Sequence, residues 1–571
     1  MPRTRRPSRP DRRPGPVPLI GVLRRYDRGW LRGDVVAGVA VAALIIPKNL
    51  GYAGIAGVPL QNGLYAAAVA ALVYAFFGSC RQISMGPSSG LAAVAASAVV
   101  AAGLTDPTEV AVFVAGITLV SGLLFLVVAL VRLSWIAQFL SRAVVTGFLF
   151  GAAIDVVVGE LSKLTGTDVS GANVLREIGS WVRSLPQAHG PTVIVGVVAL
   201  AVVFGLRRIR PGVPGALVLV AGGLLASWAF DLADRGVAVV GDIPSGLPRP
   251  SIPDPGLLLD HAGTVVTAAV ALLLIGFSQT AGDARAFAAK HRYQVDLDAE
   301  SVAQALANTA SGLCQGMPVS TSLSASALND RSGARSGVAS LVSGAVVLLT
   351  LLFLAPLFSG LPKPVLAALI IEAVVAGMMD VAALRRLARV HRLDFWIAIT
   401  ALVATVVVGV LAGVVVGVAL SLVWLIAVTT HPPLPQLGRL PGPADTEAGA
   451  TYRDVATHPD ARLIPDVAVL RVDGGVFFAS ADAVEDRVRE LVDDRTRGLL
   501  VLDCEGINFV DAQGSATFAA IARLCHESGW QLRLARVRSS VSAVLDADGV
   551  LDQIGPSQLY ASVDDAVRAR L

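Results

Sequence analysis

The 571-residue sequence has few of the residues that catalysis and metal binding most often use. It contains four cysteines and seven histidines, with no CxxC pair, no Cys/His cluster and no HExxH motif. Charged residues make up only 16% of the chain, whereas an average soluble protein has about 25%. These shortages argue against a zinc site, a disulfide framework and a soluble enzyme. We therefore expect no catalytic residue, no metal and no cofactor.

The charges that are present separate along the chain. Residues 1–33 hold ten Arg and two Asp, whereas residues 440–571 hold thirteen Arg and twenty-one acidic residues. The chain between them is apolar, and mean hydropathy over the whole sequence is +0.67. We predict a basic N-terminal segment (1–33), a membrane domain (34–430), a Pro-rich linker (431–447) and an acidic domain (448–571). The Arg-rich segment is too long and Pro-rich for a signal peptide.

Apolar windows recur throughout the membrane domain. A spanning helix needs about 20 apolar residues. The uncharged stretch Phe395–Thr430 would be about 54 Å long as one helix, so we expect two spans with a break near Gly409 and Gly413. The prediction is an α-helical polytopic membrane protein with about 14 spans. The windows are 35–47, 62–78, 88–103, 110–131, 143–158, 191–206, 213–230, 262–277, 301–313, 318–329, 338–358, 364–379 and the two halves of 395–430.

Basic residues orient these spans. By the positive-inside rule, the Arg residues of 1–33 stay in the cytoplasm, and an even number of spans returns the tail to the same side. Two further clusters should be cytoplasmic for the same reason. The first cluster is Arg207, Arg208 and Arg210, and the second is Arg385, Arg386, Arg389 and Arg392. We expect a multi-pass protein of the cytoplasmic membrane with both termini in the cytoplasm.

Two segments, 83–90 and 315–322, read as broken helices. Each places Gly and Pro before a run of hydroxyl residues that opens an apolar helix. Non-helical backbone survives in a bilayer only where it is buried or lines a cavity. A matched pair of breaks indicates an inverted-repeat transporter with its site at the membrane midplane, where two helix N-termini attract an anion. The alternative is that Gly-Pro-Ser only marks loops.

Longer motifs carry a specific resemblance. The chain resembles the SulP anion permeases over residues 30–430 and into the tail. The resemblance implies fourteen helices in two inverted seven-helix repeats, a core domain that moves against a gate domain, a cytoplasmic α/β STAS domain and a homodimer. It also implies an anionic substrate such as sulfate, bicarbonate, chloride or a dicarboxylate. The motifs are Asp34–Val39, Ile46–Ala53, Gly63–Ala66, Phe77–Pro87, Tyr293–Asp296 and Ala307–Asn308.

The same resemblance implies the residues of the binding site. Members of the family bind substrate between the two half-helix N-termini, with support from the first and eighth helices. On this chain the matching residues are Lys48, Tyr52, Pro87, Ser88, Ser89, Phe277, Gln279, Asp283, Ser320, Thr321 and Ser322.

Three of the site positions depart from the family pattern. Lys48 stands where Gln is common, Gln279 where an acid is common, and Ala325 where Arg is frequent. A charge inside the membrane costs at least about 2.5–3.5 kcal/mol, which favours a function for Lys48. We hypothesise that Lys48 supplies the positive charge missing at position 325. The alternative is that Lys48 lies near a helix end and reaches the interface.

Three intramembrane acids are candidates for coupling transport to a proton or to sodium. Asp283 lies one helical turn beyond Gln279 and on the same face, so it is the first candidate for the role of the missing acid. It could instead pair with Lys48 or Arg285, or coupling could be absent. Asp155 and Glu372 rank below it.

Alternating strand and helix patterns after residue 448 predict a small α/β domain. The segment Val501–Asp511 resembles a STAS domain. Phosphorylated STAS proteins carry a hydroxyl acceptor where this chain has Ala512, so we expect no phosphorylation switch there. Asp511 is interpreted as a helix N-cap. The tail would then assemble dimers or bind a cytoplasmic partner.

The leading hypothesis is secondary active transport of a small inorganic or organic anion with elevator-type alternating access. Its partners would be the anion, a coupled proton or sodium ion, the bilayer and a second copy, with no nucleic acid. One alternative is a nucleobase-type permease of the same fold, although Gln279 and Ala325 lack the acids such permeases use. The other is a membrane signalling module that has lost transport and acts through its STAS domain. The sequence leaves the anion and the choice among symport, exchange and uniport open.

Overall fold

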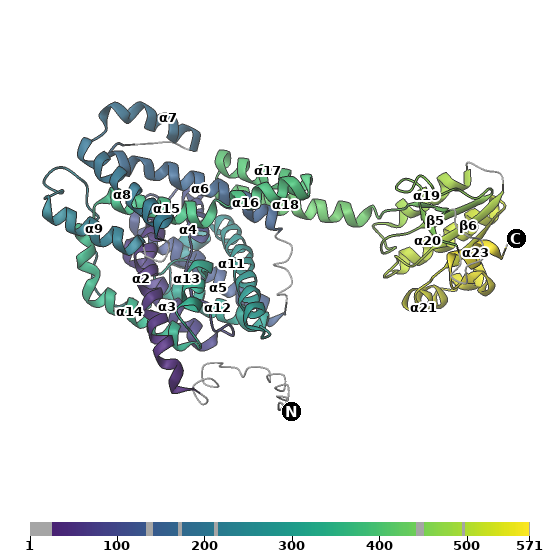
Figure 1. Ribbon diagram of the computed structural model, residues 1–571, viewed down its shortest axis with the longest axis horizontal. Coiled ribbons are helices and arrows are strands. Elements are labelled where there is room, and N and C mark those ends of the chain that lie inside the picture. The colour runs from purple at the N-terminus through teal and green to yellow at the C-terminus, as the bar shows by residue number, and fades with distance from the viewer. Residues whose placement is uncertain are drawn as a thin grey trace. The chain divides into compact units, whose positions relative to one another are not determined.

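The computed structural model describes residues 26–132, 141–168, 174–210, 215–440, 450–493 and 497–569. Contacts divide the chain into two compact units, Met1–Ser421 and Leu422–Leu571, which are described separately below. Most of the predicted basic segment 1–33 lies outside the described residues. Figure 1 traces the elements in chain order.

The first half of the membrane unit is helical except for one short strand. Trp30 is followed directly by the first spanning helix, and Gly57 ends that helix with a left-handed backbone (φ +72°), which glycine adopts without strain. Asp106 caps the helix that begins at Pro107. The elements are η1 (Arg28–Trp30), α2 (Leu31–Ala56), α3 (Leu60–Phe77), β1 (Met85–Pro87), α4 (Ser89–Ala102), α5 (Pro107–Leu130), α6 (Arg142–Thr165), α7 (Val174–Ser184), η3 (Leu185–Gln187), α8 (Gly190–Ile209) and α9 (Gly215–Ala229).

The second half repeats this order. Each half has two helices, a short strand with a short helix, two more helices, an amphipathic helix (α7 or α16) and two final helices. The elements are α10 (Pro255–Asp260), α11 (Ala262–His291), α12 (Leu297–Leu313), β2 (Val319–Thr321), α13 (Leu323–Arg331), α14 (Val338–Leu349) with η4 (Thr350–Leu354) and η5 (Ala355–Gly360), α15 (Lys363–Met378), α16 (Val381–Val390), α17 (Arg392–Val408) and α18 (Val410–Thr430).

Each of the fourteen predicted windows overlaps a helix of this unit. The break in the long uncharged stretch lies at Gly409, whose φ of +128° ends α17 before α18 begins. Among the described residues, nine helices are long and apolar enough to cross a membrane, and α4 and α9 are shorter apolar helices. The predicted polytopic helical fold with two repeats of seven is therefore confirmed.

The helices pack in two groups. Helices α2–α5 contact α11–α14, and in Figure 1 the labels of α3, α5, α12 and α13 lie close together. Helices α6, α8 and α9 contact α15, and α6 also contacts α17. The first group corresponds to the predicted core domain and the second to the predicted gate domain. Close approach between groups occurs at Gly51 of α2, where an added Cβ would lie 3.0 Å from Ile370 of α15.

The second unit is built on one mixed sheet. Its strand order is β4-β3-β5-β6-β7-β8, with β5 to β8 parallel and β3 antiparallel to both β4 and β5. The elements are β3 (Gln436–Arg439), β4 (Tyr452–Asp454), β5 (Val467–Arg471), α19 (Ala481–Asp493), β6 (Gly498–Asp503), α20 (Ala512–Glu527), β7 (Trp530–Ala535), α21 (Ser539–Ala547), α22 (Val550–Ile554), η6 (Pro556–Gln558), β8 (Leu559–Tyr560) and α23 (Val563–Arg568).

Strand β3 lies within the range 431–447 that we predicted as a linker. Leu437 pairs with Val469 of β5 and is buried in the sheet core, so the folded domain begins before residue 448. The strand was not predicted, because it has only four residues and follows a Pro-rich stretch. At the end of β6, the fully buried Asp503 accepts hydrogen bonds from Arg536 at 2.9 and 2.5 Å.

Candidate functional site

The two predicted helix breaks meet in the membrane unit. Strands β1 and β2 pair antiparallel, with Met85 opposite Thr321, Gly86 opposite Ser320 and Pro87 opposite Val319. Two inverted copies of one strand necessarily run in opposite directions, so the antiparallel pair follows from the repeat. A hydrogen bond of 2.9 Å from Ser84 N to Ser326 Oγ extends the contact between the two segments.

Each strand leads directly into a short helix capped by a serine. Ser88 Oγ accepts a hydrogen bond from Leu91 N, and Ser322 Oγ accepts one from Ala325 N, both at 3.5 Å. The first two N–H groups of each helix, at Ser89 and Gly90 in α4 and at Leu323 and Ser324 in α13, donate to no other described residue. Unpaired N–H groups and the helix dipoles give the region between the two N-termini a positive potential.

Helix α11 places two polar side chains against this pair. Gln279 Oε1 accepts hydrogen bonds from Ser320 Oγ at 2.5 Å and from Ser88 Oγ at 3.5 Å, so it joins the two broken segments. One turn later, Asp283 Oδ2 accepts a hydrogen bond of 2.8 Å from Thr321 Oγ1. Among the described residues, Asp283 forms no ion pair with Lys48 or with Arg285.

The polar face of α12 fixes the backbone of β2. Val319 N donates to Asn308 Oδ1 at 3.0 Å, and Val319 O accepts from Asn308 Nδ2 at 3.0 Å and from Gln304 Nε2 at 3.1 Å. All three residues are buried. The motif residue Asn308 therefore holds the strand that precedes the second half-helix.

Helix α2 closes one side of a small cavity beside the two strands. The residues that α2 contributes lie on one face, because they follow the helical spacing i, i+1, i+4, i+5 and i+8. The cavity encloses roughly the space of one water molecule. Its lining residues are Leu44, Ile45, Lys48, Asn49, Tyr52, Ser84, Met85, Gly86, Pro87, Ser322, Ser324 and Ala325.

Lys48 and Ala325 line this same cavity from opposite elements. Lys48 is half-buried, eight residues before the end of α2, and no described carboxylate lies within 4 Å of its Nζ. Tyr52 lies one turn further along α2, beside Ser89. The predicted residues Lys48, Tyr52, Pro87 and Ser322 therefore share one cavity.

Other predicted residues lie outside the cavity. The Phe277 ring is buried in an apolar cluster with Phe125, Ala281 and Ala305. Glu372 on α15 forms an ion pair of 3.2 Å with Arg207 on α8, and its charge acts electrostatically on Lys48. Asp155 on α6 lies near Glu177 of α7. Phe277, Asp155 and Glu372 thus do not line the cavity beside the paired strands.

The sequence reasoning missed Asn49, Ser84 and Ser324, which also line the cavity. Asn49 and Ser84 lie inside quoted motifs, yet nothing in a single sequence singles them out as lining residues. The described residues contain no cluster of three or more His, Cys, Asp or Glu side chains suited to a metal ion.

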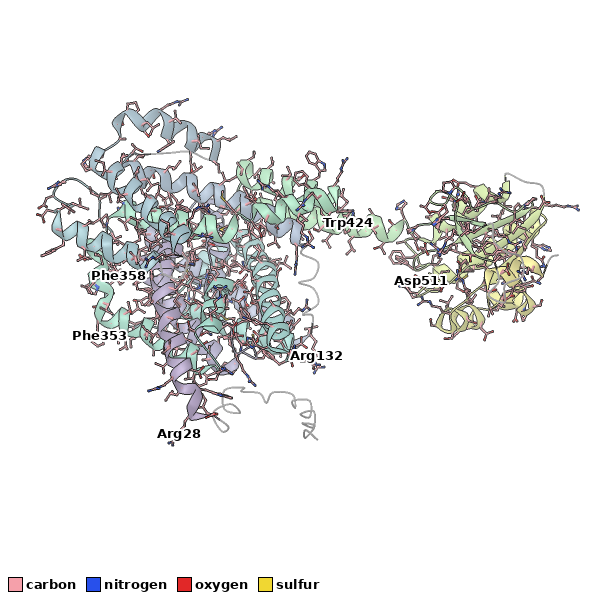
Figure 2. The ribbon with its side chains drawn as sticks, viewed as in Figure 1. Arg28, Arg132, Phe353, Phe358, Trp424 and Asp511 are labelled. Atoms are coloured by element: carbon pink, nitrogen blue, oxygen red, sulfur yellow. The ribbon has the colours of Figure 1, made fainter. Side chains whose placement is uncertain are left out.

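The STAS-like domain shows the expected cap at Asp511, labelled in Figure 2. Its carboxylate accepts hydrogen bonds from Gly514 N at 2.7 Å and from Phe478 N at 3.1 Å. Ala512 follows it, and the next hydroxyl residue along the chain, Ser515, is fully buried. Burial also raises the pKa of the Cys525 thiol to about 12.

Comparison with known proteins places these features in a family context. A model described as the Sulfate permease family matches residues 31–401, and a STAS domain model matches residues 458–566. The chain is 33% identical over 557 residues to a probable sulfate transporter of Mycobacterium tuberculosis, covering 97% of this chain and 98% of that protein. It is 28% identical to the chloroplastic sulfate transporter 4.1 of Arabidopsis thaliana, covering 95% and 80%.

Two groups of solved structures share the fold. The murine Slc26a9 anion transporter in an inward-facing state aligns with a TM-score of 0.87 and 21% identity, covering 99% of this chain and 96% of that chain. The transmembrane domain of the cyanobacterial bicarbonate transporter BicA aligns with a TM-score of 0.61 and 21% identity, covering 67% and 97%.

Proposed function

The chain belongs to the sulfate permease family, and we propose that it is a secondary active transporter that carries a small anion across the cytoplasmic membrane. The family match confirms the resemblance that the motifs predicted. Relatives named as sulfate transporters and fold neighbours that carry anions support anion transport. Within that class we propose an oxyanion such as sulfate, bicarbonate or a dicarboxylate.

One observation carries the proposal: two capped half-helices start at a pair of antiparallel strands, and a lysine lines the cavity beside them. We propose that the anion binds between the N-termini of α4 and α13, where unpaired N–H groups and hydroxyls can donate to its oxygens. The substrate-binding residues in this proposal are Lys48, Tyr52, Ser88, Ser89, Gln279, Ser320, Thr321 and Ser322. Phe277 belongs to the proposal as an apolar residue of α11 that packs in the cluster around Phe125.

Lys48 is proposed to replace the positive charge absent at Ala325. The two positions line one cavity, so a charge on either helix would act on the same bound anion. Lys48 lacks an ion-pair partner among the described residues, which leaves its ammonium group available for an anion.

The packing of the helices supports an elevator-type movement of α2–α5 with α11–α14 against the gate helices α6, α8, α9, α15 and α17. We further propose that Asp283 couples transport to a proton or to sodium, with Glu372 and Asp155 as secondary candidates. A homodimer assembled through the STAS domain, or a cytoplasmic partner bound by it, completes the proposal.

Counterflow in liposomes tests the proposed function. Liposomes that contain the purified protein would be filled with unlabelled anion. Labelled sulfate, bicarbonate, fumarate or chloride would then be added outside. We expect flux of at least one oxyanion, and Lys48→Gln should reduce it roughly 10- to 100-fold, because a hydrogen bond to a charged group is worth about 1.5–3 kcal/mol. Lys363→Gln, an exposed lysine at the start of α15, is the matched control.

Absence of flux for all four anions would instead support a signalling module that has lost transport. Unchanged flux in Lys48→Gln would remove Lys48 from the binding site. A nucleobase-type permease would take up labelled uracil and ignore the anions.

A further inference from the structure

Asn49 is an unpaired polar side chain at the proposed anion site. Its residue is only 2% exposed, and its Nδ2 group donates to no described residue. It follows Lys48 on α2, and both residues line the cavity beside β1. No hydrogen bond joins its carboxamide to the chain's other described residues, although buried amides are normally paired.

A buried, unpaired amide lowers the stability of a protein, because the group loses its hydrogen bonds to water without replacement. Leu or Ala would leave no unpaired polar group here, and α2 already lines the cavity with the apolar side chains of Leu44 and Ile45. The carboxamide therefore has a physical reason to be present only if something that enters the cavity bonds to it.

The surroundings of Asn49 define what that ligand must be. Lys48 contributes an ammonium group to the cavity. The free N–H groups of Ser89 and Gly90 lie at the start of α4, which follows β1, and those of Leu323 and Ser324 lie at the start of α13, which follows β2. Of these four residues, Ser324 also lines the cavity. These groups only donate hydrogen bonds, and they come from three different elements. An anion with several oxygens can accept from all three at once, whereas a monatomic halide presents one acceptor centre.

We infer that Asn49 is a specificity-determining residue whose carboxamide donates a hydrogen bond to an oxygen of the bound oxyanion, beside the charge of Lys48. The inference rests on the proposed function and deepens it. Lys48 attracts any anion, because its charge acts without regard to shape. Asn49 is neutral, so it selects for an acceptor placed where α2 can reach it. Together the two residues make α2 the helix that distinguishes oxyanions from chloride.

Direct binding measurements on the full-length protein test this inference. Binding of sulfate, bicarbonate, fumarate and chloride to detergent-purified protein would be measured by ligand-induced shifts in unfolding temperature and by competition against the labelled oxyanion that binds tightest. The variants are Asn49→Leu, which is nearly isosteric, and Asn49→Ala, which serves if the leucine does not fit. Ser121→Ala is the matched control, because Ser121 Oγ is also buried and unpaired but lies on α5 and does not line the cavity.

We expect Asn49→Leu to weaken oxyanion binding at least about tenfold while chloride binding changes less than about threefold. Without ligand, its unfolding temperature should equal or exceed that of the wild type, since an unpaired buried group has been removed. Ser121→Ala should leave both anion affinities unchanged.

Three outcomes would overturn the inference. They are unchanged oxyanion affinity in both Asn49 variants, equal losses for oxyanion and chloride, and a wild type that binds chloride alone. A fall in the ligand-free unfolding temperature of both variants with normal affinity would assign Asn49 a structural role instead. If Lys48→Gln abolishes binding while the Asn49 variants retain it, only this inference fails. If wild-type protein binds none of the four anions, the proposed function fails as well.

Discussion

Gln279 shows how much of the site depends on single side chains. Its Oε1 accepts from hydroxyls of both broken segments, so a neutral amide makes the contacts that a carboxylate could make. The difference is charge: a carboxylate here would stand between two helix N-termini, in the place where an anion is proposed to bind. Loss of the acid therefore removes repulsion without removing the link between the segments.

Gln279→Glu tests this role of charge through pH. The introduced carboxylate would repel the anion when ionised, whereas its protonated form is as neutral as glutamine. We expect the variant to bind the anion weakly at about pH 8 and to regain affinity as the pH falls toward about 5, where carboxyl groups protonate. Wild-type affinity, measured in parallel, should lack this additional rise on acidification. A variant that binds equally well at both pH values would show that Gln279 lies away from the anion.

Asp283 carries the prediction about coupling. Asparagine at this position keeps an acceptor for Thr321 Oγ1 and loses only the charge. If Asp283 binds the coupling ion, wild-type uptake in liposomes should respond to an imposed proton or sodium gradient, and Asp283→Asn should lose that response while still exchanging anion. Glu109→Gln, which changes an exposed acid in the first turn of α5, is the control and should retain the gradient response. A gradient effect that persists in Asp283→Asn would exclude it as the coupling residue.

The motifs predicted which segments of the chain meet better than they predicted which side chains line the cavity. The resemblance assigned Lys48 and position 325 to one site, and both line the same cavity, because the motifs that contain them are long and ordered. Phe277 was predicted at the same site; its ring packs with Phe125 in an apolar cluster and does not line that cavity. Asn49 was missed because the face a helix turns toward a cavity depends on its packing partners.

At the scale of elements, the position of β2 depends on its hydrogen bonds to α12. Asn308 bonds both the N–H and the C=O of Val319, and only the C=O has a second partner in Gln304. The half-helix α13 begins two residues after β2, so the position of its N-terminus depends on this buried amide. Composition could predict the two broken helices, but it could not predict that a third helix fixes one of them.

Asn308→Ala should therefore disturb binding from a distance. Removing the side chain leaves the buried Val319 N–H unpaired, at a cost of about 1–3 kcal/mol. We expect a lower unfolding temperature and weaker anion binding, measured on the purified full-length protein. Asn508→Ala, an exposed residue of the STAS domain, is the control and should change neither quantity. Normal anion affinity in a destabilised Asn308→Ala protein would show that β2 keeps its position without this contact.

In the C-terminal domain, too, the sequence predicted regular elements better than it predicted tertiary contacts. The alternation of strand and helix patterns correctly predicted a small α/β domain, because β5, α19, β6, α20 and β7 are each long enough to show their period. Strand β3 has four residues and follows a Pro-rich stretch, so composition favoured a linker. Its place in the sheet depends on pairing with β5, which is a tertiary interaction.

At the scale of the whole molecule, the spans and the charges give one consistent topology. Counting α2 as the first span, most basic residues at span ends and in the loops follow the second, fourth, sixth, eighth, tenth and twelfth spans, and these would face the same side as the N-terminus. Fewer follow odd-numbered spans, and they are Lys163, Arg176, Arg183, Arg235, Arg249 and Lys363. Figure 2 shows Arg132, which follows α5, on the opposite side of the membrane unit from Phe353, which lies in the second half of the eleventh span, Val338–Gly360. The basic residues that follow even-numbered spans are Arg81, Arg132, Arg142, Arg207, Arg208, Arg210, Lys290, Arg292, Arg331, Arg335, Arg385, Arg386, Arg389 and Arg392.

This arrangement predicts that both termini and the loop after α8 face the cytoplasm, whereas the loop after α9 faces outward. Single cysteines would replace Arg208 and Asp242 in a chain whose four native cysteines are changed to serine or alanine. In intact cells, a membrane-impermeant maleimide should label the Asp242→Cys variant and leave Arg208→Cys unlabelled until the membrane is opened. Because every span reverses the side, labelling of Arg208→Cys in intact cells would mean that the fold is inserted the other way, with the half-helices and Lys48 open to the opposite compartment.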